Sequence, residues 1–200
     1  MRFDGYLIFG GVLFFILLFF TCSLLHSSES LGARKVARLG ILLGLSLVLG
    51  LVEGFLPDFL LPGMRLGLAN VSILLILYVY GFKDGLFVAL LKAILVAVLR
   101  GNFLSMGGFM AFSGTLLSFL GMSALHYAFK QVSIFAVSIF GALLHVVGQI
   151  LVSYVYLGVA VWGYLPWLLL VSFFTGALVA FLCHLLLRHK SLVAYLKSSR

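Results

Sequence analysis

The sequence has few acidic residues, cysteines and prolines, and these shortages exclude several kinds of site. Only 5 of its 200 residues are Asp or Glu, 2 are Cys and 3 are Pro. Cys22 and Cys183 lie in separate apolar runs and lack the spacing of metal ligands. The chain has no Asp-rich pair to hold Mg²⁺ against a diphosphate, no G-x-x-x-x-G-K-S/T motif to bind ATP, and no Ser–His–Asp set. We therefore expect no metal site and no catalytic residues in this chain.

Apolar residues dominate the sequence instead. They make up 64% of the chain, whereas charged residues make up 9%. Residues 131–187 contain no Asp, Glu, Lys or Arg, which is enough for two membrane-spanning helices of about 20 residues each. Such continuous runs exclude a transmembrane β-barrel, whose strands alternate polar and apolar residues. The sequence predicts an all-α polytopic protein of the lipid bilayer. We ascribe its net charge of +8 to cytoplasmic loops, not to nucleic-acid binding.

The apolar runs predict seven transmembrane helices. They cover about residues 6–25, 36–56, 66–82, 85–99, 109–129, 132–157 and 166–187. The first run lacks an evident cleavage site of small residues, so we expect an uncleaved helix. The chain then divides into an additional N-terminal helix (residues 1–30) and a six-helix membrane domain with a basic tail (residues 31–200).

Basic residues predict the orientation of these helices, because cytoplasmic loops are enriched in Lys and Arg. With the cluster at residues 34–38 in the cytoplasm, 9 of the 13 basic residues fall on that side. These nine are Arg34, Lys35, Arg38, Lys83, Lys130, Arg188, Lys190, Lys197 and Arg200. The opposite orientation would place all nine outside, so we expect a cytoplasmic C-terminus.

The segment at residues 62–70 (PGMRLGLAN) joins two long apolar runs through a Pro-Gly turn. Arg65 follows this turn beside small residues and Asn70. Two interpretations stay open from the residues alone: Arg65 lines a pocket, or it binds lipid headgroups from a surface loop.

Polar residues inside the predicted spans indicate where a cavity lies. Lys92 is near mid-span, where a lysine costs about 2.5–3.5 kcal/mol, so it should face a cavity or a partner. Glu53 is near the outer end of its helix, and His145 and Gln149 share one helix face. Each has a structural alternative: Lys92 snorkels, Glu53 pairs with Arg65, and His145 is a buried packing residue. Taken together, the cations favour a cavity that attracts an anion from the outer side.

Small residues at helical spacing mark a possible contact face on the second expected helix. Ala37, Gly40 and Gly44 lie on neighbouring turns, as in small-xxx-small helix packing. This stripe predicts either packing within the chain or docking of a partner protein.

At residues 36–187 the sequence resembles the Gx transporter family, also labelled heptaprenyl diphosphate synthase component I. The matching pieces are 62–70 (PGMRLGLAN), 81–83 (GFK), 90–92 (LLK), 101–103 (GNF) and 145–149 (HVVGQ). Lys92 stands where the family pattern has Arg, which keeps the charge but loses the bidentate fork. The family in turn is similar to the substrate-binding S components of energy-coupling factor (ECF) transporters.

The resemblance implies an S-component-like protein of a bacterial-type cytoplasmic membrane that captures a vitamin-like solute. Its partners would be a transmembrane coupling protein (EcfT-like), docked through Ala37, Gly40 and Gly44, and two ABC ATPases that hydrolyse ATP. Family members are also associated with flavin supply, so riboflavin, FMN or FAD is the expected transported substrate. No tightly bound cofactor is expected.

From the residues we expect Arg65 and Lys92 to attract the anionic part of the ligand. His145, Gln149 and Asn70 would hydrogen-bond its polar edge, and Glu53 belongs to the same candidate site. Asn102 and a loop at Gly107–Gly108 would close the site from outside.

Two other functions are alternatives to transport. The synthase label makes the chain at most a non-catalytic membrane subunit of a prenyl diphosphate synthase, because the carboxylates that hold Mg²⁺ are missing. The other is an assembly protein of a membrane redox complex.

Overall fold

The computed structural model describes residues 30–53, 67–129 and 131–198. They form helices joined by turns, and no β-strand occurs among them, which confirms the predicted all-α class. The helix expected at residues 6–25 and the turn that carries Arg65 lie outside the described residues.

Seven α-helices and one 3₁₀-helix are described. In chain order they are α2 (Ser30–Val52), α3 (Asn70–Val79), α4 (Phe82–Leu99), α5 (Met106–Ala128), α6 (Ile134–Leu157), the 3₁₀-helix η2 (Gly158–Tyr164), α7 (Leu165–Arg188) and α8 (Lys190–Lys197).

Three helical stretches in this part of the chain are long and apolar enough to cross a membrane. They are Gly32–Val52, Met106–Ala128 and Ile134–Arg188, and the last contains α6, η2 and α7. Their lengths of 21, 23 and 55 residues correspond to about 30 Å or more at 1.5 Å per residue. The fold is therefore that of an all-α membrane protein.

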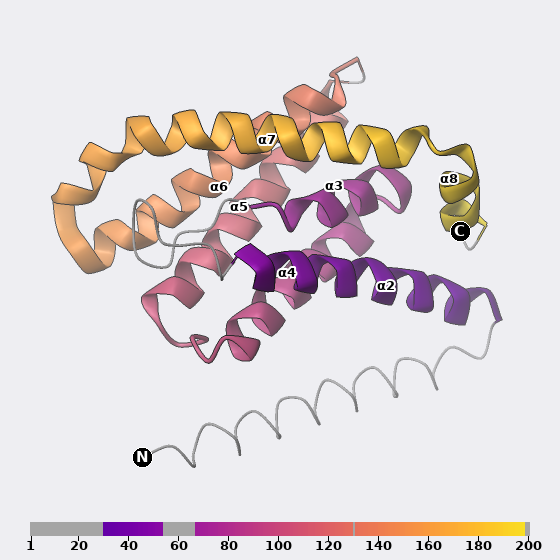
Figure 1. The fold of residues 1–200 in the computed structure, drawn as a ribbon, viewed down its shortest axis with the longest axis horizontal. Coiled ribbons are helices and arrows are strands. Elements are labelled where there is room, and N and C mark those ends of the chain that lie inside the picture. The colour runs from indigo at the N-terminus through magenta and orange to yellow at the C-terminus, as the bar shows by residue number, and fades with distance from the viewer. Residues whose placement is uncertain (1–29, 54–66, 130, 199–200) are drawn as a thin grey trace, which may run out of the picture.

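Helix α3 is the centre of the bundle. It lies between α2 and α7 in Figure 1 and also contacts α4, α5 and α8. All its residues except Tyr78 are buried, as expected for a helix that is apolar all round. Side chains of α3, among them Ile73, Leu74 and Ile76, therefore form the middle of the hydrophobic core.

Two glycines make α3 shorter than the predicted 66–82 helix. Gly67 and Gly81 have φ values of +88° and +94°, a backbone conformation that favours glycine. The helix between them has 10 residues and is about 15 Å long, roughly half the hydrocarbon core of a bilayer. The expectation that this run spans the membrane as one helix is wrong for the described residues.

The boundaries of two other helices also differ from expectation. The break expected between the runs at 66–82 and 85–99 is displaced, because α4 already begins at Phe82 with Asp84 in its first turn. Gly107 and Gly108 are not in a loop but in the first turn of α5, where Ser105 accepts a hydrogen bond from the Gly108 N–H (3.4 Å).

The basic tail contains a helix that we did not predict. Helix α8 follows α7 after the single residue His189, and Figure 1 shows it at the end of the bundle where α2 begins.

Candidate functional site

Four helices bring polar side chains together in the apolar interior. Asn70 comes from α3, Lys92 from α4, Ser118 from α5, and His145 and Gln149 from α6. Each of the five is no more than 5% exposed. We call these residues the polar cluster. Polar groups buried in a membrane protein are costly, so a cluster of them is a functional-site hypothesis by default.

Asn70 joins three of the helices. Its Oδ1 accepts a hydrogen bond from Lys92 Nζ (3.5 Å), and its Nδ2 donates to Ser118 Oγ (3.4 Å). Both distances are at the long end for hydrogen bonds, so these contacts are weak. The Asn70 amide therefore links α3 to α4 and α5 through two long contacts.

His145 and Gln149 are one helical turn apart on α6, and their Nε2 atoms are 3.1 Å apart. An amide nitrogen only donates, so with this amide orientation His145 Nε2 is the acceptor. This pair contributes hydrogen-bonding groups to the cluster.

Glycines let the backbone come close to these side chains. A Cβ at Gly67 would lie 3.2 Å from Asn70 Nδ2 and 3.9 Å from His145 Cδ2, so this glycine lies between the two. A Cβ at Gly114 would lie 2.9 Å from the His145 carbonyl oxygen and 3.1 Å from Gln149 Cγ. Helices α5 and α6 therefore pack too closely at this point for a larger residue.

Glu53 anchors the start of α3 next to the cluster. Its Oε1 accepts a hydrogen bond from the Ala69 N–H (3.1 Å), and Ser46 Oγ donates to the Ala69 carbonyl (2.9 Å). A carboxylate at a helix N-terminus is favourable because the helix dipole is positive there. Glu53 thus orients the residue that precedes Asn70.

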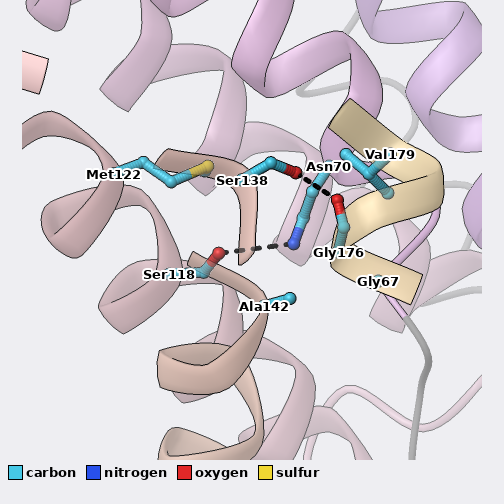
Figure 2. Close-up of a pocket in the computed structure, with 8 residues that line it drawn as sticks. All are labelled: Gly67, Asn70, Ser118, Met122, Ser138, Ala142, Gly176 and Val179. Carbon is cyan, nitrogen blue, oxygen red and sulfur yellow. Dashed lines mark hydrogen bonds between the residues drawn. The ribbon is translucent and has the colours of Figure 1, made fainter. Parts of the chain in front are cut away.

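A small cavity borders the polar cluster, and the residues that line it include Gly67, Asn70, Ser118, Met122, Ser138 and Gly176 (Figure 2). Its volume is about 10 Å³, roughly the space of one water molecule. Ser138 Oγ donates to the Gly176 carbonyl (2.7 Å), which ties α6 to α7 at its edge. The cavity extends the set of hydrogen-bonding groups around Asn70.

A larger, apolar pocket lies between α4 and α5 and beside the turn that joins them. Its volume is about 220 Å³. The lining side chains include Ala93, Ala97, Phe103, Leu104, Phe109 and Phe112. Ala93 follows Lys92 directly, so α4 contributes residues both to the polar cluster and to the lining of this pocket.

The structure brings together most of the residues predicted for the site. Asn70, Lys92, His145 and Gln149 converge, and Glu53 anchors the adjoining helix end. Arg65 lies outside the described residues. Asn102 lies in the turn between α4 and α5, where its carbonyl accepts hydrogen bonds from Ser105. The closing role of Asn102 stays a prediction.

Sequence reasoning missed Ser118, and it did not assign Ser138 to the site. Serines are common in membrane helices and usually bond to their own backbone, so neither is distinctive alone. The spacing of residues could have indicated Ser118, because Gly114, Ser118 and Met122 are each four residues apart and share one face of α5.

The predicted docking residues lie on α2. Ala37 is exposed and Gly40 is partly exposed. A Cβ added at Gly44 would meet nothing within 4 Å. The described part of the chain therefore leaves open space at Gly44.

Apolar spans around a buried polar cluster define the class: a polytopic α-helical membrane protein with a candidate binding site between its helices. The model of the heptaprenyl diphosphate synthase component I family matches residues 42–186. The chain belongs to this family, and the resemblance stated from its motifs is confirmed. No curated protein and no solved structure matches it.

Proposed function

We propose that this chain is the substrate-binding S component of an ECF-type transporter. Its polar cluster would bind the polar part of a vitamin-like solute, with a flavin (riboflavin, FMN or FAD) as the preferred candidate. One observation carries the proposal: five polar side chains from four helices are buried at one point of an apolar bundle. Each of these polar groups costs insertion free energy, so their gathering at one point supports a binding role.

The chemistry of the cluster suits such a solute. Lys92 supplies a positive charge for a phosphate or another anionic group. The Asn70 and Gln149 amides each offer a donor and an acceptor, which complements the alternating C=O and N–H groups of a flavin's pyrimidine edge. The apolar pocket beside Phe103, Phe109 and Phe112 offers ring faces to an aromatic ligand.

The transport proposal also needs partner chains. The open space at Gly44 on α2 suits close approach of another helix. We propose that a coupling protein with two ATPases docks there.

The family's description favours a second candidate, a non-catalytic membrane component of a prenyl diphosphate synthase. A prenyl diphosphate also pairs an anionic group with an apolar tail, so the same cluster and pocket would receive it. Catalysis would then belong to a partner subunit.

Ligand binding tests the proposal directly. The purified chain in nanodiscs is titrated into FMN and riboflavin, and binding is followed by quenching of flavin fluorescence. Replacing Lys92 with Ala removes a charge-assisted hydrogen bond worth about 1.5–3 kcal/mol. We expect FMN affinity to fall roughly ten- to a hundredfold. The matched control is Lys83→Ala, because Lys83 lies on the same helix but is exposed.

Arg65→Ala and Gln149→Ala extend the same titration, and we expect both to weaken FMN binding. If all three variants bind FMN like wild type, the site is elsewhere. Binding of farnesyl diphosphate but of neither flavin would favour the synthase candidate. ATP-driven uptake by the chain reconstituted with a coupling protein and ATPases would then test transport itself.

A further inference from the structure

Helix α8 is packed onto the end of the bundle. It contacts α7 and α3, and its Leu196 side chain is 4% exposed and belongs to the main hydrophobic core. Figure 1 shows α8 turning back from the end of α7 toward the start of α2. The apolar face of this short amphipathic helix therefore packs against the rest of the protein.

A buried arginine fixes the far end of α8. Arg38 of α2 is 7% exposed, and its Nη1 and Nη2 donate to the Leu196 carbonyl (3.3 Å) and to Ser198 Oγ (3.0 Å). Its guanidinium also lies 4.2 Å from the centre of the Tyr195 ring. Tyr80 Oη donates to the same Leu196 carbonyl (2.9 Å). A cation at a helix C-terminus is favourable, so α2 and α3 hold α8 in a defined position.

The outward side of this end is strongly basic. Arg34 of α2, Lys83 of α4, Arg188 of α7, and Lys190 and Lys197 of α8 are all exposed. We call these five residues the basic end. The described residues contribute one acid there, Asp84, and it is paired with Lys35 at 2.8 Å. This ion pair also shows that the starts of α2 and α4 lie together.

The position of α8 identifies the surface that these cations face. Helix α7 has 24 residues, about 36 Å, which is enough to cross the hydrocarbon core. A helix that follows it after one residue lies at the boundary between membrane and water. Amphipathic helices at that boundary lie among the headgroups, and exposed tyrosines such as Tyr195 are typical there.

We propose that the basic end is a binding surface for anionic phospholipids. Its exposed lysines and arginines would contact the headgroup phosphates of the adjacent leaflet, while Arg38 and Tyr80 keep α8 in place. This surface lies on other residues than the polar cluster, so the proposal stands whatever solute the chain binds.

Native mass spectrometry of the full chain tests this proposal. The protein in neutral detergent is titrated with phosphatidylglycerol and, separately, with phosphatidylcholine, and bound lipids are counted. We expect wild type to prefer phosphatidylglycerol. Each cation near an anionic surface contributes about fivefold in affinity. The double variant Lys190→Gln/Lys197→Gln should therefore lose roughly 25-fold in phosphatidylglycerol affinity.

Two control variants separate charge at this surface from other effects. Lys190→Arg/Lys197→Arg keeps the charge and should keep the preference. Arg100→Gln removes one charge at the opposite end of α4 and should change nothing. Both lysines are exposed, so the double variant should fold, and equal thermal stability in neutral detergent will verify this.

Three results would overturn the proposal. The first is equal binding of both lipids by wild type. The second is an unchanged preference for phosphatidylglycerol in the double glutamine variant, which would indicate that these lysines bind an acidic protein or another partner instead of lipid. The third is an equal rise in melting temperature with inorganic phosphate in phosphatidylcholine nanodiscs and with phosphatidylglycerol, which would indicate a site for the free anion.

Discussion

Gly114 places the backbone of α5 directly against the two polar residues of α6. An alanine there would put its Cβ 2.9 Å from the His145 carbonyl oxygen and 3.0 Å from His145 Cε1. Overpacking of this kind costs about 1–3 kcal/mol. We predict that Gly114→Ala lowers the melting temperature in detergent and also weakens ligand binding, because it moves His145 and Gln149.

Gly163 is the matched control for this substitution. It lies in η2, its φ is not positive, and a Cβ there would meet nothing within 4 Å. Gly163→Ala should leave stability and binding unchanged. A Gly114→Ala protein with wild-type stability would show that α5 and α6 are not in close contact at this point.

At the scale of single residues, the sequence predicted those site residues that are polar and lie within otherwise apolar helices. Lys92, Asn70, His145 and Gln149 are conspicuous because an apolar helix has no other use for them, and the structure brings them together. Ser118 was not predicted, since its partner Asn70 is 48 positions away and nothing local indicates that pairing. Contacts of this range depend on how the helices pack.

Among the helices, α2 carries the docking prediction. Open space at Gly44 argues against the interpretation that this part of the stripe packs within the described chain. We predict that Gly40→Leu/Gly44→Leu leaves ligand binding intact but blocks assembly with a coupling protein, because larger side chains prevent close helix contact. Co-purification with a tagged coupling protein measures assembly. Equal loss of binding and assembly would instead assign the stripe to internal packing.

Hydrophobicity predicted where α2 to α7 lie but not how each helix ends. The apolar run that contains α3 continues to Phe82, but the helix ends at Val79, just before Gly81 with its positive φ. Helix α8 was missed for a different reason. Its eight residues hold only a short apolar stripe, and packing of Leu196 and the contact with Arg38 stabilise it. These are tertiary interactions that the sequence of the tail does not reveal.

On the scale of the whole molecule, the structure gathers separate basic segments at one end. Lys35 pairs with Asp84 next to Lys83, and Arg38 bonds to the end of α8. These segments are far apart in sequence, and the alternation of helices predicted that they share a side. Arg100 is the C-cap residue of α4, about 26 Å along the helix from Lys83. The basic end therefore lies at the other end of α4 from Arg100, and the orientation of the molecule in the membrane decides which end faces the solute.

We predict that the basic end faces the cytoplasm, because positively charged segments are retained there. In a background with Cys22 and Cys183 replaced by Ala, single cysteines are introduced by Ser191→Cys in α8 and Gly163→Cys in η2. Both positions are exposed, and they lie at opposite ends of α7. An impermeant maleimide applied to intact cells should label the cysteine at 163 and not the one at 191. Permeabilised cells should show labelling of both, which verifies that each cysteine is reactive. The reverse pattern in intact cells would invert the topology, and the turn between α4 and α5 would then face the cytoplasm.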